Sequence, residues 1–401
     1  MFAQSLSAIW SSWPRSTRWL ALVAAVAVVI AGIYGIFLRT NDFSVHLRYG
    51  ESFLWGNPYG FNDGTPFYPL GRLWFNAGLA SLNYYASRAL CYVAAIAGLA
   101  LTMVLWQRMA DSASPLPKEK WVPAIAWTLF VLSALIIRDL DECGLQLFLL
   151  FFLTAGGYCL VNRWHALSGF WIATAIVYKA TPVLFLPLLI WKREWRAAAW
   201  TMVFTVVLSL LPATYLGWQP MLDAHAFWLE RASGILDEQG AYPFVPGIEP
   251  PKVQNESLKA LLARYTASYP EDHPIHIDHP LFFQFSPLSD QQAKPVAMGL
   301  ILLLGAASAW RMRGGWPRPK ENPQFAADWA TACLFAALMS PLCWRQHLVM
   351  AIPCAYLVAR ERLRPGASGG WRKWLPVVAG VILLGTRREI VGHDLGIVLL
   401  S

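Results

Sequence analysis

The sequence predicts an all-α protein that crosses a membrane many times, and three observations support this prediction. The chain is 56% hydrophobic and only 14% charged, and long apolar runs recur from one end of its 401 residues to the other. These runs are uninterrupted, unlike the alternating pattern of a membrane β-barrel. In lipid, only helices and closed barrels satisfy their own backbone polar groups, and since the barrel pattern is missing, the runs are predicted to be helices. The 21 tryptophans suit the two membrane–water interfaces.

The apolar runs predict about eleven spans within a single integral membrane domain covering residues 1–401. A candidate twelfth span covers 390–400. In chain order, the expected spans are 19–38, 84–106, 121–137, 144–161, 166–178, 181–191, 197–216, 294–310, 327–340, 347–359 and 374–386.

The distribution of basic residues predicts the orientation. The formal charge of +8 comes from clusters in short loops, which all lie on one side if the N-terminus is cytoplasmic. This is the positive-inside pattern, so we expect no nucleic-acid partner. The clustered residues are Arg15, Arg18, Arg108, Lys118, Lys120, Lys192, Arg193, Arg196, Arg311, Arg313, Arg318, Lys320, Arg360, Arg362, Arg364, Arg372 and Lys373.

Two segments that face the other side are long enough to hold structure of their own. The first, 40–83, begins where the first span delivers the carboxylate of Asp42 to the membrane boundary. Within it, His46–Trp55 is expected to be an interfacial helix with Leu47, Phe53, Leu54 and Trp55 facing the acyl chains. The second, 217–293, is rich in proline, histidine and aromatic residues and is expected to form a small cap.

Lys179 lies at a break between two apolar runs that are too short to span singly. Thr181 and Pro182 follow it, so we expect a hairpin of short helices with Lys179 at its tip. Broken backbone at membrane depth is tolerated where it lines a cavity, and a lysine there suggests a functional site. The alternative is that Lys179 extends to the interface and has no role.

A second candidate lies in the turn Ser340–His347, between two later spans. Arg345 and His347 could contact a phosphate there, and a capped, solvated turn is the alternative. In the segment 217–293, Asn255 and Ser257 read as the polar start of a helix, with Arg264 further along.

Acidic residues suggest one further site. Asp139, Asp141 and Glu142 fall in a short outward loop, where they could bind a divalent cation or simply be solvated. His273, His276 and His279 match no standard zinc spacing. The chain has no P-loop, dinucleotide fingerprint or G-x-S-x-G elbow, which argues against nucleotide-driven transport and serine hydrolysis.

Taken in chain order, these motifs resemble those of the GT-C polyprenyl-phosphate-dependent glycosyltransferases, specifically family 87. That family includes bacterial α-mannosyltransferases and arabinofuranosyltransferases. The resemblance covers about residues 30–360. It rests on Asp42 followed by Gly56-Asn57-Pro58-Tyr59, on Tyr178-Lys179-Ala180-Thr181-Pro182, on Asn255-x-Ser257-Leu258 with Arg264, and on Ser340-Pro341-x-x-Trp344-x-x-His347.

The resemblance implies roles for these residues. Asp42 would be the catalytic base, and Lys179, His347, Arg345 and Arg264 would surround the donor phosphate and sugar. The residues expected to bind the acceptor or support the site are Asn57, Tyr59, Asn255, Ser257 and Trp344. The family is usually metal-independent, so no cofactor is expected, with a cation at Asp139 and Asp141 left open.

Two departures affect the expected donor contacts. Gln346 precedes His347 where the family usually has paired histidines, and Glu142-Cys143-Gly144-Leu145-Gln146 replaces the frequent Gly-Gln-x-Asn. The expected activity is inverting transfer of a sugar, mannose or a related one, from a polyprenyl-phosphate donor to a glycan or glycolipid. We expect it on the outer face of the bacterial cytoplasmic membrane. The alternatives are an O-antigen ligase or polymerase, working through 217–293, and a lipid-linked sugar flippase or transporter.

Overall fold

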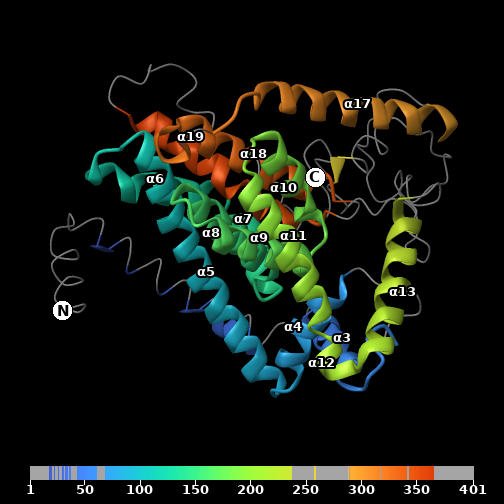
Figure 1. The fold of residues 1–401 in the computed structure, drawn as a ribbon. Helices are drawn as coiled ribbons and strands as arrows, with labels where there is room; N and C mark the ends of the chain where they lie inside the picture. The colour runs from blue at the N-terminus through green and yellow to red at the C-terminus, as the bar shows by residue number, and fades with distance from the viewer. Residues whose placement is uncertain are drawn as a thin grey trace.

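The computed structural model describes residues 43–60, 68–236, 257–258, 288, 290–316, 318–340 and 343–364, with separate helical positions between 18 and 37. Helices dominate these ranges, as the sequence predicted (Figure 1). The α-helices are α3 (Phe43–Leu54), α4 (Leu70–Ala80), α5 (Tyr84–Ala113), α6 (Trp121–Val131), α7 (Ser133–Asp141), α8 (Leu145–Val161), α9 (His165–Tyr178), α10 (Phe185–Trp191), α11 (Trp195–Leu210), α12 (Ala213–Leu216), α13 (Trp218–Leu236), α17 (Asp290–Arg311), α18 (Pro323–Leu338) and α19 (Ile352–Leu363). Short 3-10 helices are η1 (Lys118–Lys120), η2 (Thr181–Leu184), η3 (Pro319–Glu321) and η4 (Arg345–Ala351).

The membrane character of the chain is carried by a few long helices and several shorter ones. Among the described residues, Tyr84–Ala113 and Trp195–Leu216 are long and apolar enough to cross a bilayer. The pair α6 and α7, bent by 66° at Leu132, would add a third if it forms one span. Shorter apolar helices include α8 and α9. The fold is therefore that of an all-α polytopic membrane protein. The expected spans at 374–386 and 390–400 lie outside the described residues.

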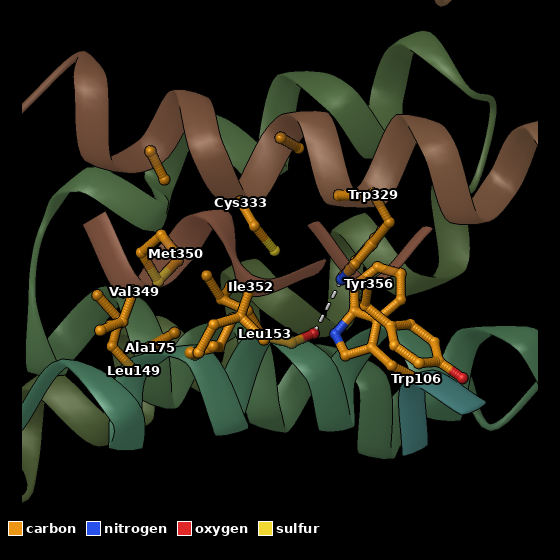
Figure 2. Packing of buried hydrophobic residues seen from close by; sticks show 14 of the residues in the cluster. Trp106, Leu149, Leu153, Ala175, Trp329, Cys333, Val349, Met350, Ile352 and Tyr356 are labelled. Atoms are coloured by element: carbon orange, nitrogen blue, oxygen red, sulfur yellow. Dashed lines mark hydrogen bonds between the residues drawn. The ribbon is translucent and has the colours of Figure 1, made fainter. Parts of the chain in front are cut away.

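The hydrophobic core lies where α5, α8 and α18 meet (Figure 2). The indole of Trp106 donates to the hydroxyl of Thr154 at 3.0 Å, and the indole of Trp329 donates to the carbonyl of Leu153 at 3.0 Å. A Cβ at Gly157 would lie 2.6 Å from Nε1 of Trp329, so only glycine allows α18 to come this close to α8. This packing fixes α8 against the later helices, and the N-terminus of α8 reaches the candidate site.

The hairpin of short helices is present as predicted and is held by a buried ion pair at its far end. Lys192, just after α10, lies 2.6 Å from the carboxylate of Asp328 on α18, and both side chains are almost completely buried. Lys192 also donates to the carbonyls of Met312 and Gly314, and the indole of Trp316 donates to Asp328. Since every strong donor and acceptor of the pair has partners, the contact ties α10 firmly to α18.

Two local predictions were wrong. The helix α3 exists, and Trp55 just after it is 78% exposed, but Leu47 and Phe53 are buried rather than turned toward acyl chains. Phe53 stacks on Tyr215, since α4 and the region around α12 cover this face of α3. The acids at 139–141 do not form a loop, because the chain bends at Leu132 and continues as α7 through Asp141.

Candidate donor-phosphate site

Lys179 occupies the break between α9 and η2. Its backbone is extended (φ −153°, ψ 130°), so α9 ends there, although its N–H still donates to the carbonyl of Ala175. The side chain is buried, at 8% exposure. Its ammonium donates to Oε1 of Gln146 at 3.3 Å and lies 3.2 and 3.4 Å from the two ring nitrogens of His347. The break therefore turns a lysine inward, where a cation is costly without anionic partners.

His347 reaches Lys179 from a part of the chain 168 residues away. It lies in η4, and its Nδ1 accepts the backbone N–H of Trp344 at 3.1 Å. A neutral imidazole has one donor and one acceptor nitrogen, so this bond places the proton on Nε2. Nδ1, 3.2 Å from the ammonium of Lys179, can accept from it as well, while the Nε2–H, 3.4 Å from the ammonium, is a donor. An ammonium beside an imidazole N–H offers two donor groups of the kind that bind an oxyanion.

The first turn of α8 forms the third side of the site. Gln146, in this turn, accepts from Lys179. The two carboxylate oxygens of Asp139, at the end of α7, accept the backbone N–H groups of Gln146 and Leu147 at 3.1 and 3.0 Å. Asp139 is fully buried, so it caps α8 rather than lying in solvent as one interpretation of the sequence had it.

The structure adds a buried arginine that sequence reasoning missed. Arg72, on α4, is fully buried, and its guanidinium lies 4.1 Å from the ring centre of Tyr178, the residue before Lys179. The guanidinium also lies over the ring of Tyr68, 4.4 Å from its centre. The spacing of Leu70, Leu73 and Ala77 fits a helix facing the protein, and an arginine within that run was the available signal.

The loop after α3 holds two of the predicted residues. Asn57 is exposed, and its backbone carbonyl accepts the hydroxyl of Ser52 at 2.7 Å. Tyr59 is buried and donates to the carbonyl of Tyr68 at 3.1 Å, while burial raises its pKa. The loop therefore supports the site indirectly: Tyr59 fixes Tyr68, and Tyr68 packs on Arg72.

The remaining predicted residues are placed as follows. Ser257 is fully buried, while Trp344 and Arg345 are half-buried at the start of η4. Asp42, Asn255 and Arg264 lie outside the described residues, so their proposed roles stay predictions. Within the described ranges, no three His, Cys, Asp or Glu side chains are grouped to hold a metal ion, and a cation at Asp139 and Asp141 also stays a prediction. Of the predicted donor contacts, the structure brings together Lys179 and His347.

Comparison with known proteins identifies the family. The family model described as Glycosyltransferase family 87 matches residues 67–341, which is more than half of the chain. The match contains Arg72, Gln146 and Lys179 and ends shortly before His347. No curated protein and no solved structure matches the chain. A family match of this extent, on an all-α polytopic membrane fold, shows that the chain belongs to glycosyltransferase family 87, of the GT-C type.

Proposed function

We propose that this glycosyltransferase takes its sugar from a polyprenyl-phosphate donor and that the phosphate binds at Lys179 and His347. The observation that supports the proposal is the contact, at 3.2 and 3.4 Å, between the ammonium of Lys179 at the break of the hairpin and the imidazole of His347 in η4, with both side chains buried. An ammonium and an imidazole N–H can hold phosphate oxygens and stabilise the charge that grows on them as the sugar leaves. A lipid-linked donor also accounts for a site within an apolar protein.

The reaction proposed is a single displacement. The carboxylate of Asp42 removes the proton of the acceptor hydroxyl, and the acceptor oxygen attacks the anomeric carbon. The bond between that carbon and the phosphate oxygen breaks, and its electron pair stays on the phosphate. Lys179 and His347 stabilise this leaving group. Because the acceptor oxygen attacks from the face opposite the departing phosphate, the configuration at the anomeric carbon inverts. Arg345 and Arg264 are proposed to assist at the phosphate and the sugar.

The finer assignments rest on the resemblance described above. The sugar is proposed to be mannose or a related hexose or pentose, and the acceptor a glycan or glycolipid. Asn57, Tyr59, Asn255, Ser257 and Trp344 are proposed to support the acceptor or the site. The basic loops favour an outward-facing site in a bacterial cytoplasmic membrane, and no metal cofactor is proposed to be required.

The proposal predicts release of polyprenyl phosphate from a radiolabelled polyprenyl-phosphate sugar by the purified protein when acceptor is present. Release should follow transfer one for one and should be unchanged by chelation of divalent cations. A panel of mannosyl and pentosyl donors identifies the sugar. Transport of intact donor across vesicles without bond cleavage, or no release with any donor of the panel, would contradict the proposal.

A further inference from the structure

Arg72 is a buried cation with no hydrogen-bond partner in the part of the chain that the structure describes. Its side chain is completely inaccessible, and none of its three guanidinium nitrogens has a partner among the described residues. The guanidinium lies over the rings of Tyr68 and Tyr178, 4.4 and 4.1 Å from their centres. Aromatic faces attract a cation, but they leave the five N–H donors at the edge of the guanidinium unused. A buried charged group whose donors lack acceptors destabilises the protein unless a bound ligand accepts their hydrogen bonds.

The charges of the described residues around Arg72 do not balance. Arg72 and Lys179 are close enough to repel each other through their charges, and both are attracted to the carboxylate of Asp139. The two oxygens of Asp139 already accept backbone N–H groups from α8, at Gln146 and Leu147. Among the described residues, this part of the protein therefore holds two buried cations, Arg72 and Lys179, and the carboxylate of Asp139, which is occupied as a helix cap. A bound anion would restore the balance.

Two neighbouring polar side chains, Asn76 and His46, also have buried polar atoms with no partner in the described ranges. Asn76, one turn after Arg72 on α4, is fully buried, and neither its amide oxygen nor its amide nitrogen has a partner among the described residues. The same holds for Nδ1 of His46 on α3, whose ring lies beside that of Tyr68. Burial and the charge of Arg72 hold the pKa of His46 well below its ordinary value, so its ring is neutral. Buried polar groups normally have partners, so a cluster of unpaired ones indicates a binding site.

We propose that Arg72 contacts the departing lipid phosphate together with Lys179 and is matched to the second negative charge that the phosphate gains. This inference rests on the proposed function. The donor is a phosphodiester with one negative charge. When the anomeric carbon–oxygen bond breaks, the electron pair stays on the phosphate oxygen and the product is a dianion. Two cations fit this product better than the donor, and the guanidinium fork can hold two phosphate oxygens at once.

The test compares two lipids that differ by one charge. Binding of decaprenyl phosphate, a dianion at pH 8, and of decaprenyl methyl phosphate, a monoanion, is measured on the purified full-length protein and on Arg72→Gln and Arg72→Lys. We expect the wild type to bind the dianion at least about tenfold more tightly, since one charge-assisted contact is worth that much. Arg72→Gln should lose this preference, and Arg72→Lys should keep part of it. Arg108→Gln, a change at an exposed arginine, is the control and should bind as wild type.

The thermal unfolding temperature without ligand gives a second readout. A buried guanidinium that serves ligand binding lowers the stability of the free protein. The unfolding temperature of Arg72→Gln should therefore be no lower than that of wild type. If Arg72→Gln keeps the wild-type preference for the dianion, the inference is wrong and the proposed function stands. If the wild type binds neither lipid phosphate better than neutral decaprenol, the proposed function fails as well. If Arg72→Gln and Arg72→Lys both fail to fold, the guanidinium is a structural element and the inference is overturned.

Discussion

Replacing Lys179 with glutamine is expected to lower the rate of sugar transfer by roughly 10²–10³-fold, the usual cost of losing one donor that stabilises a transition-state oxyanion. Glutamine keeps a hydrogen-bond donor for Gln146 but removes the charge beside His347. The charge is needed most when the lipid phosphate leaves, so the turnover number should fall more than the apparent affinity for the donor. The measurement is the initial rate of polyprenyl-phosphate release at several donor concentrations.

The control for this variant is Lys118→Gln, a change at an exposed lysine in a basic loop. It should leave the rate unchanged. The unfolding temperature of Lys179→Gln should match or exceed that of wild type, because an incompletely compensated buried cation is removed. A folded Lys179→Gln protein that transfers sugar at more than about a tenth of the wild-type rate would be inconsistent with a phosphate-binding role.

Replacing Asp42 with asparagine is expected to reduce transfer by about 10²–10⁴-fold, which is the range attributed to general base catalysis. Asparagine has nearly the same shape but cannot accept the proton of the acceptor hydroxyl. Binding of the donor should persist, since the phosphate is proposed to be held by Lys179 and His347. Transfer and donor binding are therefore measured on the same preparation.

Glu51→Gln is the matched control, because Glu51 is an exposed acid on α3, nine residues after Asp42. Its transfer rate should be that of wild type. The alternative enzyme class, an O-antigen ligase or polymerase working through residues of 217–293, predicts that Asp42→Asn has little effect on the transfer rate. Full activity of Asp42→Asn would therefore remove the proposed base and favour the rival mechanism.

The two site residues that lie where apolar runs are interrupted, Lys179 and His347, were predictable from the sequence. Proline after Lys179 cannot continue a helix made of an already short apolar run, so the break and its lysine followed from local rules. The turn with His347 was identified in the same way, from a polar segment between two apolar runs. That these two residues lie 3.2 Å apart could not be derived, because it depends on packing between segments 168 residues apart.

The partners of the buried charged residues Asp139 and Arg72 were the features of the site that the sequence predicted least well. Asp139 looked like part of a solvated or metal-binding loop, since three acids occur in four residues. Its actual partners are the amides of α8, which come close only because the chain bends at Leu132 and α7 packs beside the start of α8. Arg72 was overlooked for a related reason. The segment 40–83 was treated as a loop with one interfacial helix, and α4 was not recognised within it.

The most direct test of the central claim is the position of a bound polyprenyl phosphate in an experimental structure of the purified protein, for instance a cryo-EM map of the complex. The claim predicts phosphate oxygens about 3 Å from Nζ of Lys179 and from Nε2 of His347, which is hydrogen-bond distance. The prenyl chain should leave the site beside the hairpin of α9 and α10. A phosphate bound elsewhere, with Lys179 still on Gln146, would contradict the account.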